Sequence, residues 1–194
     1  MAFSSSIIAF LFGTLIGLLV AFNDFPGKRI VVTFMRTLMG LPPVVVGIIV
    51  YVLFSGTGPF GNLGLIYSVK LMIIAQVVLI TPIVAGMTET AISPIVKNAL
   101  PSLVFLIIGE SKYQLIAVYL FAFARAISEV GAVQIVGGNI LYKTRVMTTA
   151  IALNYNTGDF SMAIALGFIL LMISLCVNCV AALLQFGLKR RKHA

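Results

Sequence analysis

The sequence predicts an all-α integral membrane protein with about five transmembrane helices. Only 9% of its 194 residues are charged and 61% are hydrophobic, whereas soluble domains carry about 25% charged residues. The apolar residues form long uncharged blocks at 2–23, 37–69, 71–88 and 160–188, and about 20 such residues cross a bilayer as a helix. The blocks show no sustained alternation of period two, so a membrane β-barrel is not expected.

The blocks predict spans at 4–22, 37–54, 71–88 and 160–188, and a fifth at 117–137 that contains Arg125 and Glu129. The first block is too long for a signal peptide and lacks a basic start, so we expect it to be retained as a helix. No soluble second domain and no internal repeat is evident. We therefore treat 1–194 as a single transmembrane domain.

The basic residues indicate the orientation, because cytoplasmic loops of membrane proteins are enriched in Lys and Arg. If the tail 189–192 is cytoplasmic, the internal side also holds Lys28, Arg29, Lys97 and Lys112, and the external side holds only Lys70, Lys143 and Arg145. This predicts a multi-pass protein of the cell membrane with its N-terminus outside. The polar connection 89–116 then faces the cytoplasm. The net charge of +8 is thereby explained by membrane anchoring and contact with lipids, without nucleic acid.

Two of the predicted spans contain residues that interrupt an ordinary apolar helix. Pro42 and Pro43 each remove a backbone donor, which predicts a kink that either shapes a pathway or serves packing alone. Arg125 and Glu129 lie one helical turn apart, and a single charge at the bilayer centre costs about 2.5–3.5 kcal/mol on insertion scales. We expect this pair at a wet pathway or subunit contact, the alternative being a self-neutralised pair that pins the helix near an interface.

Several kinds of chemistry find no support in the sequence. The chain lacks the glycine-rich loop that cradles nucleotide phosphates, and its one histidine, His193, lies in the basic tail. Cys176 and Cys179 have no third or fourth ligand nearby, so we interpret them as packing residues. Gly13 and Gly17 permit close helix packing. We expect no catalysis, metal or cofactor on this chain.

Four stretches, taken in order, carry a family resemblance: Phe25-Pro-Gly-Lys-Arg29, Leu41-Pro-Pro-Val-Val-Val-Gly47, Gly58-Pro-Phe-Gly-Asn-Leu-Gly64, and Arg125-Ala-Ile-Ser-Glu-Val-Gly-Ala-Val133 followed by Gly137-Gly-Asn-Ile140. Together they resemble the permease subunits of bacterial and archaeal binding-protein-dependent ABC importers of type I fold. Within these, the chain resembles the tungstate/molybdate branch. The Ile-Ser-Glu-Val-Gly-Ala-Val segment is more similar to the tungstate type than to the molybdate type.

The resemblance implies a permease that translocates tungstate, or molybdate, between two copies of the chain. It further implies an extracytoplasmic oxyanion-binding protein and cytoplasmic ATP-binding subunits, which would hold the ATP and Mg. A stand-alone secondary transporter or an uncoupled accessory subunit is the alternative. The expected pathway or gate residues are Pro42, Pro43, Arg125, Glu129 and Gly131, and those of the external mouth are Asn139, Lys143 and Arg145.

The resemblance also implies a cytoplasmic coupling segment, within 89–116, that docks on the ATPase. The segment Gly109-Glu-Ser-Lys-Tyr-Gln-Leu-Ile116 resembles the middle of that motif, and Gly109 is expected to supply a turn. Leu103-Val-Phe-Leu106 stands where the family has acidic and alanine residues. The coupling region and the part before the first span are both shorter than in the family, which indicates a truncated or divergent member. The coupling residues predicted are Gly109, Glu110, Ser111, Lys112 and Tyr113.

Overall fold

The structure, a computed structural model, describes residues 1–98 and 104–190, with side chains for 1–96 and 114–179. Over this part it contains eight α-helices, one short 3-10 helix (η1, Gly61–Leu63) and no strand. Three helices are long and apolar enough to cross a membrane: α1 (Ala2–Phe22), α4 (Val69–Asn98) and α8 (Phe160–Arg190). Two bent helix pairs raise the number to as many as five spans. The predicted all-α membrane fold is therefore confirmed.

Both bent pairs fall where the sequence predicted single spans. The 37–54 span is broken between α2 (Lys28–Met39) and α3 (Pro43–Phe54), which meet at 96°. The predicted kink at Pro42 and Pro43 is thus a full break, because the residue before a proline disfavours the helical conformation. The 117–137 span is likewise broken between α5 (Val104–Ile127) and α6 (Gly131–Gly137), at 53°. The kink predicted within 37–54 is therefore present as a sharper bend, and the continuous helix predicted over 117–137 is wrong.

The predicted loops contain more helix than expected. The connection assigned to 89–116 is largely helical, because α4 continues to Asn98 and α5 begins at Val104. Gly109 lies inside α5 rather than at a turn, which corrects the sequence-based expectation. A glycine costs a helix only about 1 kcal/mol, and the helix continues on both sides of Gly109. The segment 138–159, which contains Lys143 and Arg145 of the predicted external side, also contains a helix, α7 (Met147–Asn156).

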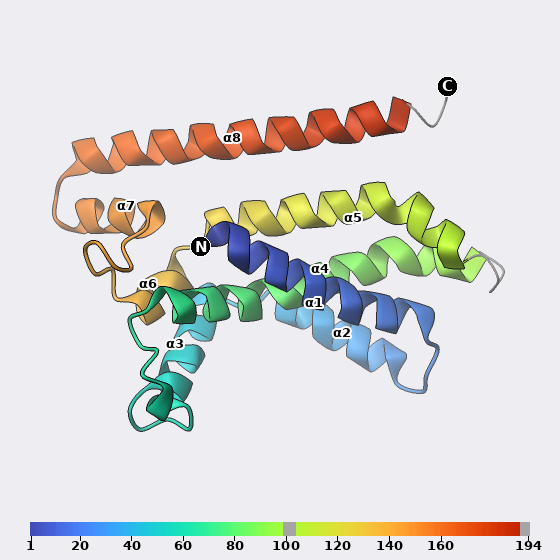
Figure 1. The fold of residues 1–194 in the computed structure, drawn as a ribbon, viewed down its shortest axis with the longest axis horizontal. Helices are drawn as coiled ribbons and strands as arrows, with labels where there is room; N and C mark the ends of the chain where they lie inside the picture. The colour runs from blue at the N-terminus through green and yellow to red at the C-terminus, as the bar shows by residue number, and fades with distance from the viewer. Residues whose placement is uncertain (99–103, 191–194) are drawn as a thin grey trace.

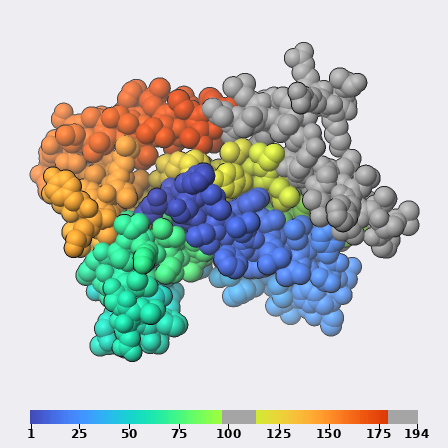
Figure 2. Space-filling model, in the orientation of Figure 1, coloured from blue at the N-terminus to red at the C-terminus, as the bar shows by residue number. Residues whose placement is uncertain are grey.

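Helix α4 is the centre of the molecule, and α1, α4, α5 and α8 all follow its long axis (Figure 1). One apolar cluster joins α4 to α3 and α6, and a second joins α4 to α1 and α5. The turn after α1, the end of α4, the start of α5 and the end of α8 lie at one end of the molecule. Helix α3 with the following loop and helix α2 with the preceding turn project as two separate lobes (Figure 2).

Glycines let α1 approach α4 closely, as the sequence predicted. A Cβ atom on Gly13 would lie 2.6 Å from Val84 Cβ, and one on Gly17 would lie 2.6 Å from the carbonyl oxygen of Ala85. These distances are too short for any side chain. The α1–α4 contact therefore depends on the absence of a side chain at Gly13 and Gly17.

We predict that Gly17→Ala destabilises the protein, by about 1–3 kcal/mol as overpacking does. Gly167→Ala in α8 is the matched control, because a Cβ atom at Gly167 meets nothing within 4 Å. Both variants gain the same helix propensity, so their difference isolates packing. Thermal unfolding of the purified protein measures it. Equal stability of the two variants would show that α1 does not pack as described.

Candidate functional site

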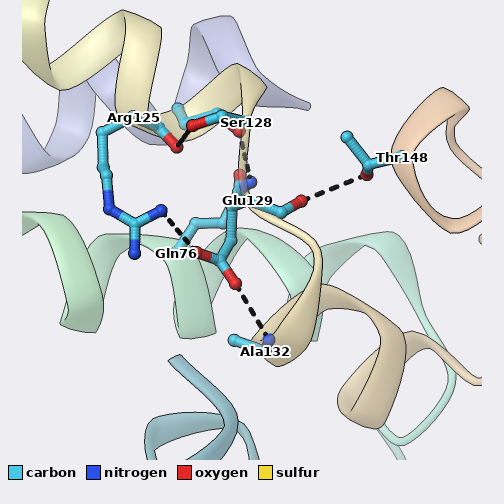
Figure 3. Close-up of polar contacts among 7 residues, drawn as sticks. Gln76, Arg125, Ser128, Glu129, Ala132 and Thr148 are labelled. Atoms are coloured by element: carbon cyan, nitrogen blue, oxygen red, sulfur yellow. Dashed lines mark hydrogen bonds and ion pairs between the residues drawn. The ribbon is translucent and has the colours of Figure 1, made fainter. Parts of the chain in front are cut away.

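The break between α5 and α6 leaves backbone carbonyls without helical partners inside the membrane domain. Three side chains satisfy them (Figure 3). Ser128 donates to the carbonyl oxygen of Arg125 at 3.2 Å, and Gln76 Nε2 donates to that of Ala126 at 3.0 Å. Thr148 Oγ1 donates to the carbonyl oxygen of Glu129 at 3.1 Å. An unsatisfied backbone group costs several kcal/mol in lipid. These three hydrogen bonds remove that cost at the break and fix its position.

The Glu129 carboxylate stabilises both sides of the break. Its Oε1 accepts a hydrogen bond from the backbone N–H of Ala132 at 3.0 Å, which caps the start of α6. Its Oε2 lies 2.9 Å from an Arg125 guanidinium nitrogen. Oε2 receives no hydrogen bond of good geometry, so its stabilisation by Arg125 is ionic. The Glu129 side chain is 1% exposed and that of Arg125 is 28% exposed, so the pair runs from the interior toward the surface.

Gln76 connects this break to the rest of the helix bundle. While its amide nitrogen binds the carbonyl of Ala126, its Oε1 accepts a hydrogen bond from Ser5 Oγ at 2.7 Å. Both side chains are completely buried. The start of α1, the first third of α4 and the end of α5 are therefore joined by one polar chain at the level of the break.

The two broken spans meet each other at their breaks. A Cβ atom on Gly131, the first residue of α6, would lie 3.6 Å from Pro43 Cβ and 3.0 Å from a Val44 methyl group. One turn further along α3, a Cβ on Gly47 would lie 2.8 Å from the Cα of Ala132. Glycine at these two positions lets the first turns of α3 and α6 touch along their backbones.

A small apolar hollow lies beside the break on its other side. It has a volume of about 310 Å³ and is bordered by Glu129, Thr148 and apolar residues of α1, α7 and α8. Apart from Glu129 and Thr148, the residues that border this hollow are apolar. Within the described part of the chain, no group of three His, Cys, Asp or Glu side chains comes together as a metal site.

The structure brings most of the predicted pathway residues together. Arg125, Glu129 and Gly131 form one side of the junction, and Pro43 forms the other beside Pro42 at the start of α3. Their role in transport stays a prediction.

The predicted external residues lie in one braced loop. Arg145 Nε donates to Asn139 Oδ1 at 3.3 Å, and Lys143 is exposed beside them. The coupling residues Gly109, Glu110, Ser111, Lys112 and Tyr113 lie in the first half of α5. Their side chains lie outside the described residues, so the predicted contact with an ATPase stays a prediction.

Sequence reasoning missed the neutral partners of the break, which are Gln76, Thr148, Ser5 and Ser128. Gln76 could have been found, because it is the only polar residue among the ten residues 71–80, and polar groups inside a span tend to be functional. Thr148 could not, since it lies 19 residues from Glu129 in a segment without a span signal.

A helical membrane domain with two broken spans meeting around a buried ion pair is typical of membrane transport proteins. Comparison with known proteins specifies the class. The chain is 41% identical over 180 residues to the tungstate uptake system permease protein TupB of Peptoclostridium acidaminophilum, covering 88% of this chain and 79% of that protein. It is 37% identical over 169 residues to TupB of Campylobacter jejuni, covering 82% and 71% of the two chains.

A third relative is a probable anion ABC transporter permease protein of Haloferax volcanii, 36% identical over 185 residues, with 88% of this chain and 80% of that protein covered. No protein-family model matches the sequence. The chain belongs to the permease family of anion ABC transporters that includes the tungstate uptake permeases. It is a multi-pass membrane permease subunit.

We predict that Arg125→Ala strongly destabilises the protein, because it leaves the Glu129 carboxylate buried without its cation, at a cost of about 3–5 kcal/mol. Glu129→Gln should be milder, since the amide oxygen can still cap α6. The double variant should recover much of the loss of Arg125→Ala. Chemical unfolding of the purified variants measures this order. Wild-type stability and uptake in both single variants would mean that the pair has no such role.

Proposed function

We propose that this chain is the permease subunit of an ATP-driven importer of tungstate, with molybdate as the second candidate substrate. The observation that carries the proposal is the 41% identity to a tungstate uptake permease over most of both chains. It is supported by the junction of two broken spans, since irregular backbone at membrane depth is tolerated where it is buried in protein or lines a cavity.

The ion pair suits the passage of a dianion. A lone arginine at this depth would attract an oxyanion and hold it, and conduction requires binding weak enough for the ion to leave. Glu129, 2.9 Å from the guanidinium, neutralises that charge. We infer that Arg125 and Glu129 keep the region of the junction polar without binding the oxyanion so tightly that it cannot leave. This pathway would run between two copies of the chain.

The chain would act with partners on both sides of the membrane. ATP hydrolysis would reside on cytoplasmic subunits, contacted by the Gly109–Tyr113 part of α5. An extracytoplasmic binding protein would deliver the oxyanion to the loop of Asn139, Lys143 and Arg145. In this orientation the N-terminus is outside and the C-terminus is cytoplasmic, as the distribution of Lys and Arg favours.

The loop from Gly138 to Arg145 is suited to an encounter with an anion or an acidic partner. Backbone N–H groups of Lys143, Thr144 and Arg145 all donate to the carbonyl oxygen of Ile140, at 3.2, 3.0 and 3.0 Å. This bracing holds two cations in a fixed place, and fixed positive charge raises the local concentration of anions.

The test is uptake of tungstate and molybdate by cells that express the chain with its neighbouring transporter subunits and lack other transporters for these ions. Tungsten and molybdenum in the cells are measured by mass spectrometry, and proteins that co-purify with the chain are identified. We expect tungsten accumulation and co-purification of an ATPase and a binding protein. Uptake without either partner would favour a stand-alone transporter.

In the same assay, replacing Lys143 and Arg145 together with Gln should slow uptake several-fold at low salt and less at high salt, because exposed charges are screened within about 10 Å at 0.1 M salt. Lys70→Gln serves as the matched control on the same predicted side. Unchanged uptake at every salt concentration in the double variant would exclude this role for the loop.

A further inference from the structure

A second hollow lies at the end of the molecule where α1 turns into α2, away from the junction of the broken spans (Figure 1). Its volume is about 750 Å³, and its walls come from the turn after α1, the first turns of α2, and α4. Five charged residues border it: Asp24, Lys28, Arg29, Arg36 and Glu89.

Among the side chains that the structure describes, Arg29 is the one of these five without a partner of opposite charge. Lys28 Nζ lies 2.9 Å from Asp24 Oδ1 and also donates to the carbonyl oxygen of Ala21 at 3.4 Å, so it holds the turn together. Arg36 faces Glu89 at 3.8 Å. Arg29 forms no ion pair with any residue whose side chain the structure describes. The five described charged residues of the hollow, three cations and two anions, together carry one surplus positive charge.

Arg29 is next to a second source of positive potential. Helix α2 begins after Gly27, which has a left-handed backbone (φ 93°), and its N-terminus has neither a side-chain cap nor an acidic residue in its first turn. A helix N-terminus of this kind favours phosphate. The N–H groups of Lys28 and Ile30 already donate to the carbonyl oxygens of Phe25 and Gly27. The phosphate site at the rim therefore consists of the Arg29 side chain beside the positive end of the helix dipole.

The inner part of the hollow differs from the rim because it contains a buried negative charge, Glu89. Its side chain is only 8% exposed, and its Oε2 accepts no hydrogen bond from any side chain that the structure describes. The Arg36 nitrogen at 3.8 Å is too far away to donate one. A buried carboxylate whose nearest cation is beyond hydrogen-bond distance is costly, and a second cation, carried by a ligand in the hollow, would lower that cost. A second negative charge would increase it.

The hollow also continues onto an apolar surface. A neighbouring groove of about 390 Å³ runs along α2 and shares Arg29, Ile30 and Thr33 with it. Beyond the shared residues the groove includes Phe34. Ile30 and Phe34 are 75% and 62% exposed. A basic helix with such an apolar face is typical of segments that lie in the membrane interface.

We propose that this site binds a phospholipid with a primary-amine headgroup, phosphatidylethanolamine. The phosphate contacts Arg29 at the start of α2, the ammonium pairs with the accessible edge of the Glu89 side chain, which borders the hollow, and an acyl chain follows Ile30 and Phe34. A free oxyanion or an anionic lipid would satisfy Arg29 but would not supply an ammonium to Glu89. Phosphatidylcholine has the same charges as phosphatidylethanolamine but no N–H donor.

The test uses the full-length chain, purified with its bound partners, stripped of lipid and titrated with three lipids of identical acyl chains, with native mass spectrometry as the readout. We expect phosphatidylethanolamine to bind about tenfold more tightly than phosphatidylcholine or phosphatidylglycerol, as one charge-assisted hydrogen bond supplies. Glu89→Gln should abolish this preference. Arg29→Gln, at an exposed position, should weaken the binding of phosphatidylethanolamine about tenfold. Lys70→Gln, at the other end of α4, should leave the binding of all three lipids unchanged.

Four results would overturn the proposal. These are equal binding of the three lipids by the wild type, tighter binding of phosphatidylglycerol, an undiminished preference in Glu89→Gln, or displacement of phosphatidylethanolamine by millimolar tungstate or inorganic phosphate. The last result would identify the site as one for a free oxyanion. Binding lost in Arg29→Gln but kept in Lys70→Gln separates a specific site from general attraction to basic residues.

Discussion

One buried carboxylate holds together the part of the molecule on which the rest depends. Glu129 caps α6 through Oε1 and faces Arg125 through Oε2, so a single side chain stabilises the end of one helix segment and the start of the next. Its charge is tolerable in a low-dielectric interior only because both contacts are made at once. The polar chain from Ser5 through Gln76 and the donor from Thr148 then tie α1, α4 and α7 to the same point.

This constraint accounts for the architecture of both broken spans. With α6 held at a 53° angle to α5, Gly131 and Ala132 present bare backbone to the start of α3, and Gly47 and Pro43 pack against them. The junction is thus a backbone contact between two half-helices, anchored by one ion pair. An importer that alternates between two openings needs elements with two discrete arrangements, and short half-helices on unwound hinges meet that need better than continuous spans do.

The membrane fold, the ion pair and the glycine contact of α1 could be predicted from the sequence, because each depends on a local signal. These signals are the apolar blocks, an i, i+4 charge pair and the spacing of Gly13 and Gly17. The break at 128–130 could not be predicted in the same way. Its stability comes from Gln76 and Thr148, which lie 50 residues before Ala126 and 19 residues after Glu129. Glu89 and Arg36 were missed for the same reason, since they approach each other only in the folded chain. The glycine at 109 misled in the opposite direction, because one weak helix former does not end a helix that continues for several residues on both sides.

The central claim is that the breaks of the two spans touch, and a disulfide tests it most directly. Pro43 Cβ and a Cβ at Gly131 would be 3.6 Å apart, within the range of about 3.5–4.5 Å for a disulfide. With Cys176 and Cys179 replaced by Ser, the variant carrying Pro43→Cys and Gly131→Cys should form an intramolecular disulfide under mild oxidation in native membranes, detected as two peptides joined in mass spectrometry. Each single-cysteine variant should form none. Absence of the crosslink in correctly inserted, folded protein would contradict the account.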